Sequence, residues 1–149
     1  MYIQVEEVTL PIRFIVFTGH FIAVLAVVFD FDRIVSCITE IDPTKATGSA
    51  LDSFEESKQQ LEGLAYTSVA CFCIEYITLF LGVSIFLRHI TLYNIIAHLG
   101  GLLLTVIFYA DCWDIGVFAA FFVVFSLLPM LADLAALLYT SKLAVFIKY

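Results

Sequence analysis

The segment Ile115–Tyr139 reads IGVFAAFFVVFSLLPMLADLAALLY, and in its 25 residues Asp133 is the only charged side chain. A helix rises about 1.5 Å per residue, so this segment can cross the roughly 30 Å hydrocarbon core of a bilayer. It is apolar on every side, whereas a surface helix of a soluble protein has one polar face. Three further segments have the same character, and they are Ile12–Phe29, Leu64–Leu87 and Leu92–Ala110. The sequence therefore predicts an all-α fold, a bundle of four transmembrane helices.

The composition excludes several classes of function. Hydrophobic residues make up 62% of the 149 residues, and the net charge is −7. A negative net charge argues against nucleic-acid binding, which selects clustered Lys and Arg side chains. The sequence has no residue spacing typical of a phosphate, haem or zinc site, and its three His residues are isolated from one another. We therefore expect a single transmembrane domain over residues 1–149, with no enzyme activity, no cofactor and no small-molecule substrate.

The connections between the predicted spans differ greatly in length. Residues 88–91 join spans two and three, and residues 111–114 join spans three and four, so these three helices should be antiparallel neighbours. Residues 30–63 form a long polar loop between spans one and two. In this loop Ser53 and Glu56 have the spacing of a capping box, which predicts a short amphipathic helix that precedes span two or extends it out of the bilayer.

Basic residues indicate the orientation of the chain, because Lys and Arg near span ends favour the cytoplasmic side. One side of the predicted bundle has four basic residues, and the other has three that are spread over the long loop. The first set is Arg13, Arg88, Lys142 and Lys148, and the second is Arg33, Lys45 and Lys58. This bias favours cytoplasmic N and C termini and a non-cytoplasmic loop.

Two acidic and two histidine side chains lie within the predicted spans, where a charge is costly unless it is neutralised or paired. They are His20, Glu75, His98 and Asp133. His98 is a natural partner for either acid, and together the four residues predict a polar cluster in the bundle interior. Such a cluster either holds helices together through hydrogen bonds or passes a proton or an ion, and the residues alone leave both interpretations open.

Small residues predict where helices approach closely, since they let two backbones come together. Gly82 and Ser84 fall roughly on the face of span two that has the acid, and Gly101 lies on the polar face of span three. Pro129 lacks a backbone N–H and should bend span four. We expect all four positions to serve helix packing.

The four cysteines divide into two pairs. Cys71 and Cys73 lie within span two, where two-residue spacing directs their side chains to different sides of a helix, so they do not form a metal pair. Cys37 lies in the long loop and Cys112 in the last turn. The predicted topology places both on the non-cytoplasmic side, where disulfides persist. A Cys37–Cys112 disulfide is therefore a hypothesis.

Short motifs occur in a defined order along the chain. They are Pro11-Ile12-Arg13-Phe14, Gly19-His20, Cys37, Glu75, Gly82-Val83-Ser84, Ala97-His98, Cys112, Leu128-Pro129 and Asp133. Their order and spacing resemble the transmembrane protein 107 family, small four-span proteins of the ciliary transition zone. The resemblance spans nearly the whole chain and is strongest from Glu75 to Leu134.

The resemblance implies a structural role in the Meckel-syndrome module at the base of cilia, in the gate that controls which membrane proteins enter. It implies tectonic, other transition-zone membrane proteins and B9-domain proteins as partners, besides the lipid bilayer. Two other functions fit the residues. One is a proton- or ion-coupled transport subunit that uses Glu75, His98 and Asp133, and the other is an accessory subunit of a larger membrane complex.

Overall fold

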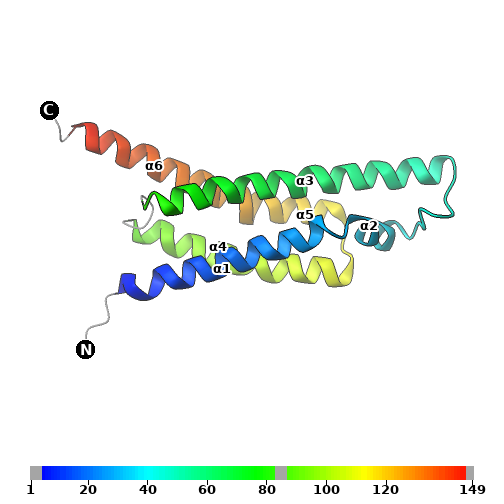
Figure 1. Cartoon of the computed structure of the whole chain (residues 1–149), viewed down its shortest axis with the longest axis horizontal. Helices are drawn as coiled ribbons and strands as arrows, with labels where there is room; N and C mark the ends of the chain where they lie inside the picture. The colour runs from blue at the N-terminus through cyan, green and yellow to red at the C-terminus, as the bar shows by residue number, and fades with distance from the viewer. Residues whose placement is uncertain (1–4, 83–86, 147–149) are drawn as a thin grey trace.

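The computed structural model describes residues 5–82 and 87–146 of the chain. In this part the chain forms helices joined by short connections, and no strand is present. Four helical segments of the described residues are long and apolar enough to cross a membrane, which confirms the predicted all-α, four-span fold. In order the elements are α1 (Val5–Val28), α2 (Phe31–Thr39), α3 (Ser49–Phe80), α4 (Arg88–Asp111), α5 (Ile115–Phe122), the π-helix η2 (Val123–Leu127) and α6 (Leu128–Phe146) (Figure 1).

The four spanning segments pack into one bundle. α1 packs mainly along α4 and also contacts α3, while α3 contacts α5, η2 and α6. α5, η2 and α6 follow one another without a break and form the last span, whose axis crosses that of α3 in Figure 1. α3 is the longest helix at 32 residues and extends past the other spans at one end of the molecule.

Most of the predicted loop over residues 30–63 is helical. The amphipathic helix predicted within it is present as the outer part of α3, which extends span two, whereas α2 was not predicted. α2 places three apolar side chains on one face, at the i, i+3 and i+4 positions that a helix brings together. They are buried against apolar side chains on the outer part of α3. Phe108 of α4 and Phe118 of α5 belong to the same core. The side chains in contact are Phe31, Ile34 and Val35 of α2 and Phe54, Leu61 and Ala65 of α3.

The capping box predicted at Ser53 is wrong, because the helix starts one turn earlier. Gly48 precedes the first turn of α3 with a φ of +63°, a left-handed conformation that glycine adopts without strain. Ser53 lies inside the helix, where its hydroxyl donates to the Ser49 carbonyl at 3.0 Å. The apolar contacts with α2 stabilise this additional length of helix.

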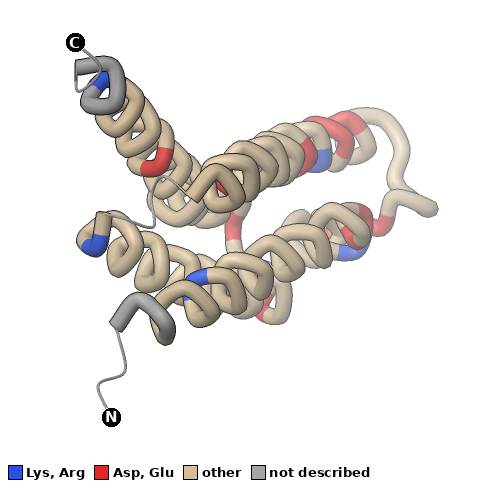
Figure 2. The backbone as a smooth tube through the Cα atoms, turned by 60° about the vertical axis from the view of Figure 1, so that its left-hand side comes forward, with Lys and Arg blue, Asp and Glu red and all other residues tan. Residues whose placement is uncertain are grey.

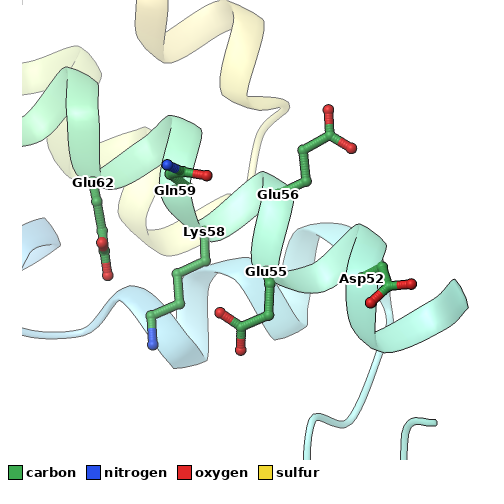
Figure 3. Close-up of a pocket in the computed structure, with 6 residues that line it drawn as sticks. All are labelled: Asp52, Glu55, Glu56, Lys58, Gln59 and Glu62. Atoms are coloured by element: carbon green, nitrogen blue, oxygen red, sulfur yellow. The ribbon is translucent and has the colours of Figure 1, made fainter. Parts of the chain in front are cut away.

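The outer part of α3 is acidic on its exposed side. Eight of the 14 acidic residues fall within residues 30–63, and Figure 2 shows red segments concentrated at this end of the molecule. Lys58 lies among them and its ammonium contacts Asp32 Oδ1 at 2.7 Å, which links α3 to α2. The acidic side chains beside it are Asp52, Glu55, Glu56 and Glu62 (Figure 3).

The connection between α2 and α3 is organised around Asp42. The Thr44 hydroxyl donates to Asp42 Oδ1 at 2.6 Å, and the Lys45 ammonium lies 3.0 Å from Oδ2. These contacts favour the ionised carboxylate, with the Thr44 hydrogen bond as the largest cause, and lower the pKa of Asp42 from 3.8 to about 2. The turn therefore keeps its hydrogen bonds at any physiological pH.

The far end of α3 also differs from the prediction. α3 ends at Phe80, whereas the predicted span continued to Leu87. Gly82 has a φ of +73° and its N–H donates to the Leu79 carbonyl, so it follows the helix end rather than lying on a helix face. The prediction of Gly82 as a helix-contact residue is therefore wrong. Ser84, predicted as its neighbour on that face, lies outside the described residues.

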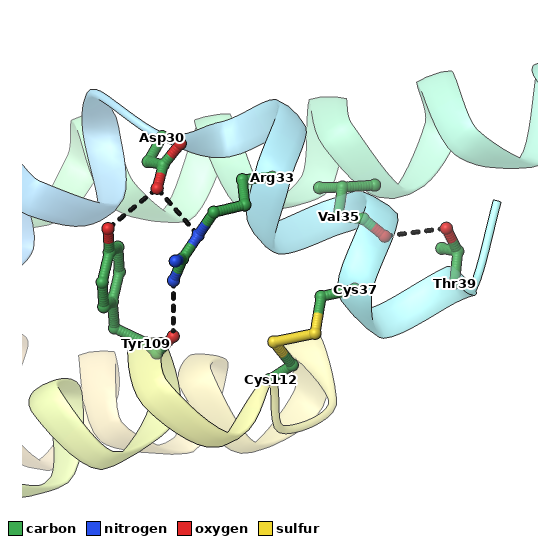
Figure 4. Close-up of a disulfide and its surroundings, with 7 residues drawn as sticks. All are labelled: Asp30, Arg33, Val35, Cys37, Thr39, Tyr109 and Cys112. Atoms are coloured by element: carbon green, nitrogen blue, oxygen red, sulfur yellow. Dashed lines mark hydrogen bonds and ion pairs between the residues drawn. A yellow bond between two sulfur atoms is a disulfide. The ribbon is translucent and has the colours of Figure 1, made fainter. Parts of the chain in front are cut away.

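A covalent and polar clamp joins α2 to the end of α4. Cys37 of α2 and Cys112, the residue that follows α4, form a disulfide across 75 residues of sequence (Figure 4). Beside it Asp30 Oδ2 accepts hydrogen bonds from Tyr109 and Arg33, at 2.8 and 2.9 Å. The Arg33 guanidinium also lies 4.4 Å from the centre of the Tyr109 ring. The clamp fixes α2 on the bundle.

We predict that Cys37→Ser lowers the free energy of unfolding by about 2–4 kcal/mol, because the disulfide restricts a long loop of the unfolded chain. Thermal unfolding of the purified protein in detergent, with and without reductant, measures the effect. Reductant should lower the Tm of the wild type toward that of the variant and leave the variant unchanged. Cys73→Ser is the matched control, since that thiol is free and exposed on the bundle surface. A wild-type Tm that is insensitive to full reduction would contradict the prediction.

Candidate functional site

The most polar part of the bundle interior surrounds Asp133 of α6. The Arg13 guanidinium on α1 donates to Asp133 Oδ2 at 2.6 Å, and the two residues are 3% and 1% exposed. Asp133 also accepts hydrogen bonds from the Thr78 hydroxyl on α3, at 3.2 Å, and from the Asn94 amide on α4, at 2.8 Å. A single carboxylate therefore contacts side chains from all the other spans. These partners satisfy a charge that would otherwise be costly in hydrocarbon.

A second chain of polar contacts lies in the same interior. Glu75 of α3, 2% exposed, contacts His98 of α4 through Oε2 and Nε2 at 2.8 Å. The other ring nitrogen of His98, Nδ1, lies 3.2 Å from Nδ1 of His20 on α1. The three side chains form a continuous hydrogen-bonded chain across three helices. Aromatic rings enclose it, since Phe17 and Phe72 both lie against the imidazoles.

Helical spacing brings these side chains to one interior. Arg13 and His20 are seven residues apart on α1, two turns along the same face. On α4, Asn94 and His98 are one turn apart on the same face, and Gly101 follows His98 on that face. Each of these helices thus contributes one group to the Asp133 contacts and one to the histidine chain.

Gly101 is the position where α4 makes room for His20. A Cβ atom at residue 101 would lie 2.2 Å from Cε1 and 2.6 Å from Nε2 of the buried His20 ring. A side chain at residue 101 would therefore collide with the His20 ring, which is held by its contact with His98. The structure thus places Gly101 at a close helix contact.

Pro129 lies at the start of α6, directly after η2. In η2 the N–H of Leu128 donates to the Val123 carbonyl, a wider turn than that of an α-helix. Because proline has no N–H to continue the α-helical pattern, such a local rearrangement is expected before it. The turn carries Ser126, whose side chain is buried in the bundle. Sequence reasoning located the proline and missed the π-helix.

The structure brings together all four ionisable residues predicted to cluster, and it adds three that the sequence analysis did not assign to the cluster. Arg13 was counted as a charge at the cytoplasmic end of span one, but α1 begins at Val5 and so carries it into the interior. Its spacing of two turns from His20 was the available signal. The other two are Thr78 and Asn94, whose role depends on how α3 and α4 are rotated.

Within the described part of the chain, two buried oxygens of this region, Oε1 of Glu75 and Oδ1 of Asn94, accept no hydrogen bond. Among the described residues no group of three or more His, Cys, Asp or Glu side chains is arranged to hold a metal ion. The geometry can therefore do two things: bind helices to one another through paired charges, and hold protons on a chain of titratable groups.

A comparison with protein-family models gives a match over residues 9–137 to the TMEM107 family, described as a transmembrane protein. The chain belongs to the transmembrane protein 107 family. The match includes every residue of the two polar groups, from Arg13 to Asp133, and both cysteines of the disulfide. No curated protein and no solved structure matches the chain. Membership of the transmembrane protein 107 family supports a multi-pass membrane protein of a family that is not known to be enzymatic.

We predict that Arg13→Met lowers the free energy of unfolding by about 3–5 kcal/mol, because it leaves the Asp133 charge buried without its cation. The double variant Arg13→Met/Asp133→Asn should be more stable than Arg13→Met alone, since it removes that unpaired charge. Unfolding in mixed micelles, as a double-mutant cycle, measures the coupling. Lys142→Met, at an exposed position of α6, is the control. Additive losses in the cycle would contradict a direct Arg13–Asp133 interaction.

We further predict that Gly101→Ala lowers the free energy of unfolding by about 1–3 kcal/mol, because the added methyl group forces the His20 ring out of place. Gly63→Ala is the matched control, since a Cβ atom at residue 63 meets nothing within 4 Å. The same unfolding assay compares the two variants. Equal stability of both would show that α4 and α1 can separate without cost at this contact.

Proposed function

We propose that the protein is a structural component of the ciliary transition-zone membrane, which helps to assemble the gate that controls the composition of the ciliary membrane. The observation that carries this proposal is the family match over residues 9–137. Members of the transmembrane protein 107 family look like components of the Meckel-syndrome module. The expected partners are tectonic, other transition-zone membrane proteins and B9-domain proteins.

The architecture is compatible with such a role. The interior of the bundle is tied by buried polar contacts, while its outer faces are apolar. Side chains such as Ile15, Ile77 and Leu138 are among the most exposed apolar ones and face either lipid or helices of other proteins. An assembly subunit needs a rigid body of this kind with broad apolar sides.

The disulfide supports an orientation. The Cys37–Cys112 bond lies at the end of the molecule formed by α2 and the outer part of α3. Disulfides persist in oxidising compartments. We therefore place this end outside the cytosol and both termini in the cytoplasm. In this orientation the acidic surface of α3 is available to partners outside the cytosol.

The test is imaging of the full chain with a C-terminal fluorescent tag in ciliated cells, against an axoneme marker and a basal-body marker. We expect the signal only in the short zone between the two markers, and we expect tectonic to be recovered with the tagged protein. Glu75→Leu should reduce recovery of tectonic, because it leaves the buried His98 ring without its hydrogen-bond partner and so disturbs the α3–α4 contact. Ile77→Leu, an exposed position on the same helix, is the control. Signal in mitochondria or over the whole plasma membrane would overturn the proposal.

A further inference from the structure

The contact between His20 and His98 joins two nitrogens of the same kind, Nδ1 to Nδ1, at 3.2 Å. A neutral imidazole has one nitrogen that donates and one that accepts. One of the two rings must therefore carry a proton on Nδ1 and the other must not. Which ring donates at this contact determines whether the other nitrogen of each ring, Nε2, carries a proton.

The Glu75 carboxyl depends on the same choice. If His98 donates from Nδ1 to His20, its Nε2 carries no proton. Nε2 must then accept a hydrogen bond from the Oε2–H group of a neutral Glu75 carboxyl. If His20 donates instead, His98 Nε2 carries the proton and donates to a Glu75 carboxylate. The hydrogen bonds at 2.8 and 3.2 Å thus permit two complete and opposite arrangements of protons.

The far end of the chain faces a narrow cavity. His20 lines this cavity together with three hydroxyl-bearing residues from three other elements. The cavity has an empty volume of about 180 Å³ but is too narrow to admit a water molecule. His20 Nε2 has no hydrogen-bond partner among the described residues. The hydroxyl-bearing residues are Ser68 of α3, Thr105 of α4 and Ser126 of η2.

We propose that Glu75, His98 and His20 form a proton relay that opens at the cavity beside η2. In the resting arrangement Glu75 is neutral, because an ionised carboxylate would leave charge on its unpartnered buried oxygen Oε1. This inference is independent of the ciliary role, since it concerns the bundle interior alone. It adds a site that binds and releases one proton.

The transfer runs in three linked steps. The Glu75 Oε2–H bond breaks as the His98 Nε2–H bond forms, and the His98 Nδ1–H bond breaks as the His20 Nδ1–H bond forms. The His20 Nε2–H bond then breaks, and the proton passes to water that enters the widened cavity. The product has a Glu75 carboxylate and two neutral imidazoles, and it holds one proton fewer than the resting arrangement.

The surroundings favour the resting arrangement. The Arg13 guanidinium and the Asp133 carboxylate are the charged pair beside the relay, and they neutralise each other in the resting arrangement. Arg13 attracts a Glu75 carboxylate, but Asp133 repels it more strongly. The other titratable groups that interact with Glu75 are Cys71 of α3 and Tyr93 of α4. η2 lines the cavity through Ser126, and single π-turns inside α-helices occur frequently at functional sites.

The test is nuclear magnetic resonance of the full chain, labelled with ¹⁵N-histidine, in lipid nanodiscs over a range of pH. We expect a ¹⁵N–¹⁵N coupling across the hydrogen bond between the Nδ1 atoms of His20 and His98. We also expect all four nitrogens of the two rings to change together at one midpoint. His89 is exposed and lies outside the relay, so its ring signals are the internal reference.

In Glu75→Gln the side-chain amide can still donate a hydrogen bond to His98, but it has no acidic proton to release. In this variant the coupling between the rings should remain and the shared pH response should be lost. The proposal is overturned by a missing coupling in the wild type, by separate midpoints for the two rings, by a wild type that shows no response, or by a response that persists in Glu75→Gln. If the variant does not fold, the wild-type coupling and midpoints still decide.

Discussion

Asp133 holds the bundle together because its carboxylate is buried where lipid offers no hydrogen-bond donor. Its partners come from every other span: Arg13 from α1, Thr78 from α3 and Asn94 from α4. Apolar side chains do not distinguish a helix neighbour from lipid, so the burial of Leu and Phe alone does not select one arrangement of four helices. A charge that needs three partners does select one. The rotation of each span about its axis therefore follows from this residue.

Outside this polar interior the molecule is held by different forces. Where α2 and the outer part of α3 meet water, the hydrophobic effect operates, and Phe31, Ile34 and Phe54 form an ordinary soluble core. The Cys37–Cys112 disulfide and the contacts of Arg33 then join this core to the end of α4. The structure thus uses paired charge where hydrocarbon surrounds it and apolar burial where water does. The two parts meet at Phe108 and Phe118, which belong to the outer core and lie on spans.

The four spans were predictable because a segment of about 20 apolar residues has few alternatives in water. The cluster of Glu75, His98, Asp133 and His20 was predictable as a set, since each is costly in lipid, but its pairing was not. Pairing depends on helix rotation, which sequence alone leaves open. The inner role of Arg13 was missed because the start of α1 was placed too late. The outer part of α3 was predictable as a helix that extends span two, because Phe54, Leu61 and Ala65 repeat at helical spacing. α2 was not predicted, because its nine residues were assigned to the polar loop.

The two polar groups of the interior are not equivalent. The contacts of Asp133 already join all four spans, whereas the chain from Glu75 to His20 joins α3, α4 and α1, which those contacts have already connected. As a means of holding helices the second group is therefore largely redundant. It also leaves Glu75 Oε1 without a partner and requires a glycine at residue 101. An apolar contact of the same volume would avoid both costs. The hydrogen-bonded chain from Glu75 to His20 differs from such a contact because its oxygens and nitrogens can exchange a proton. An apolar replacement would remove that property.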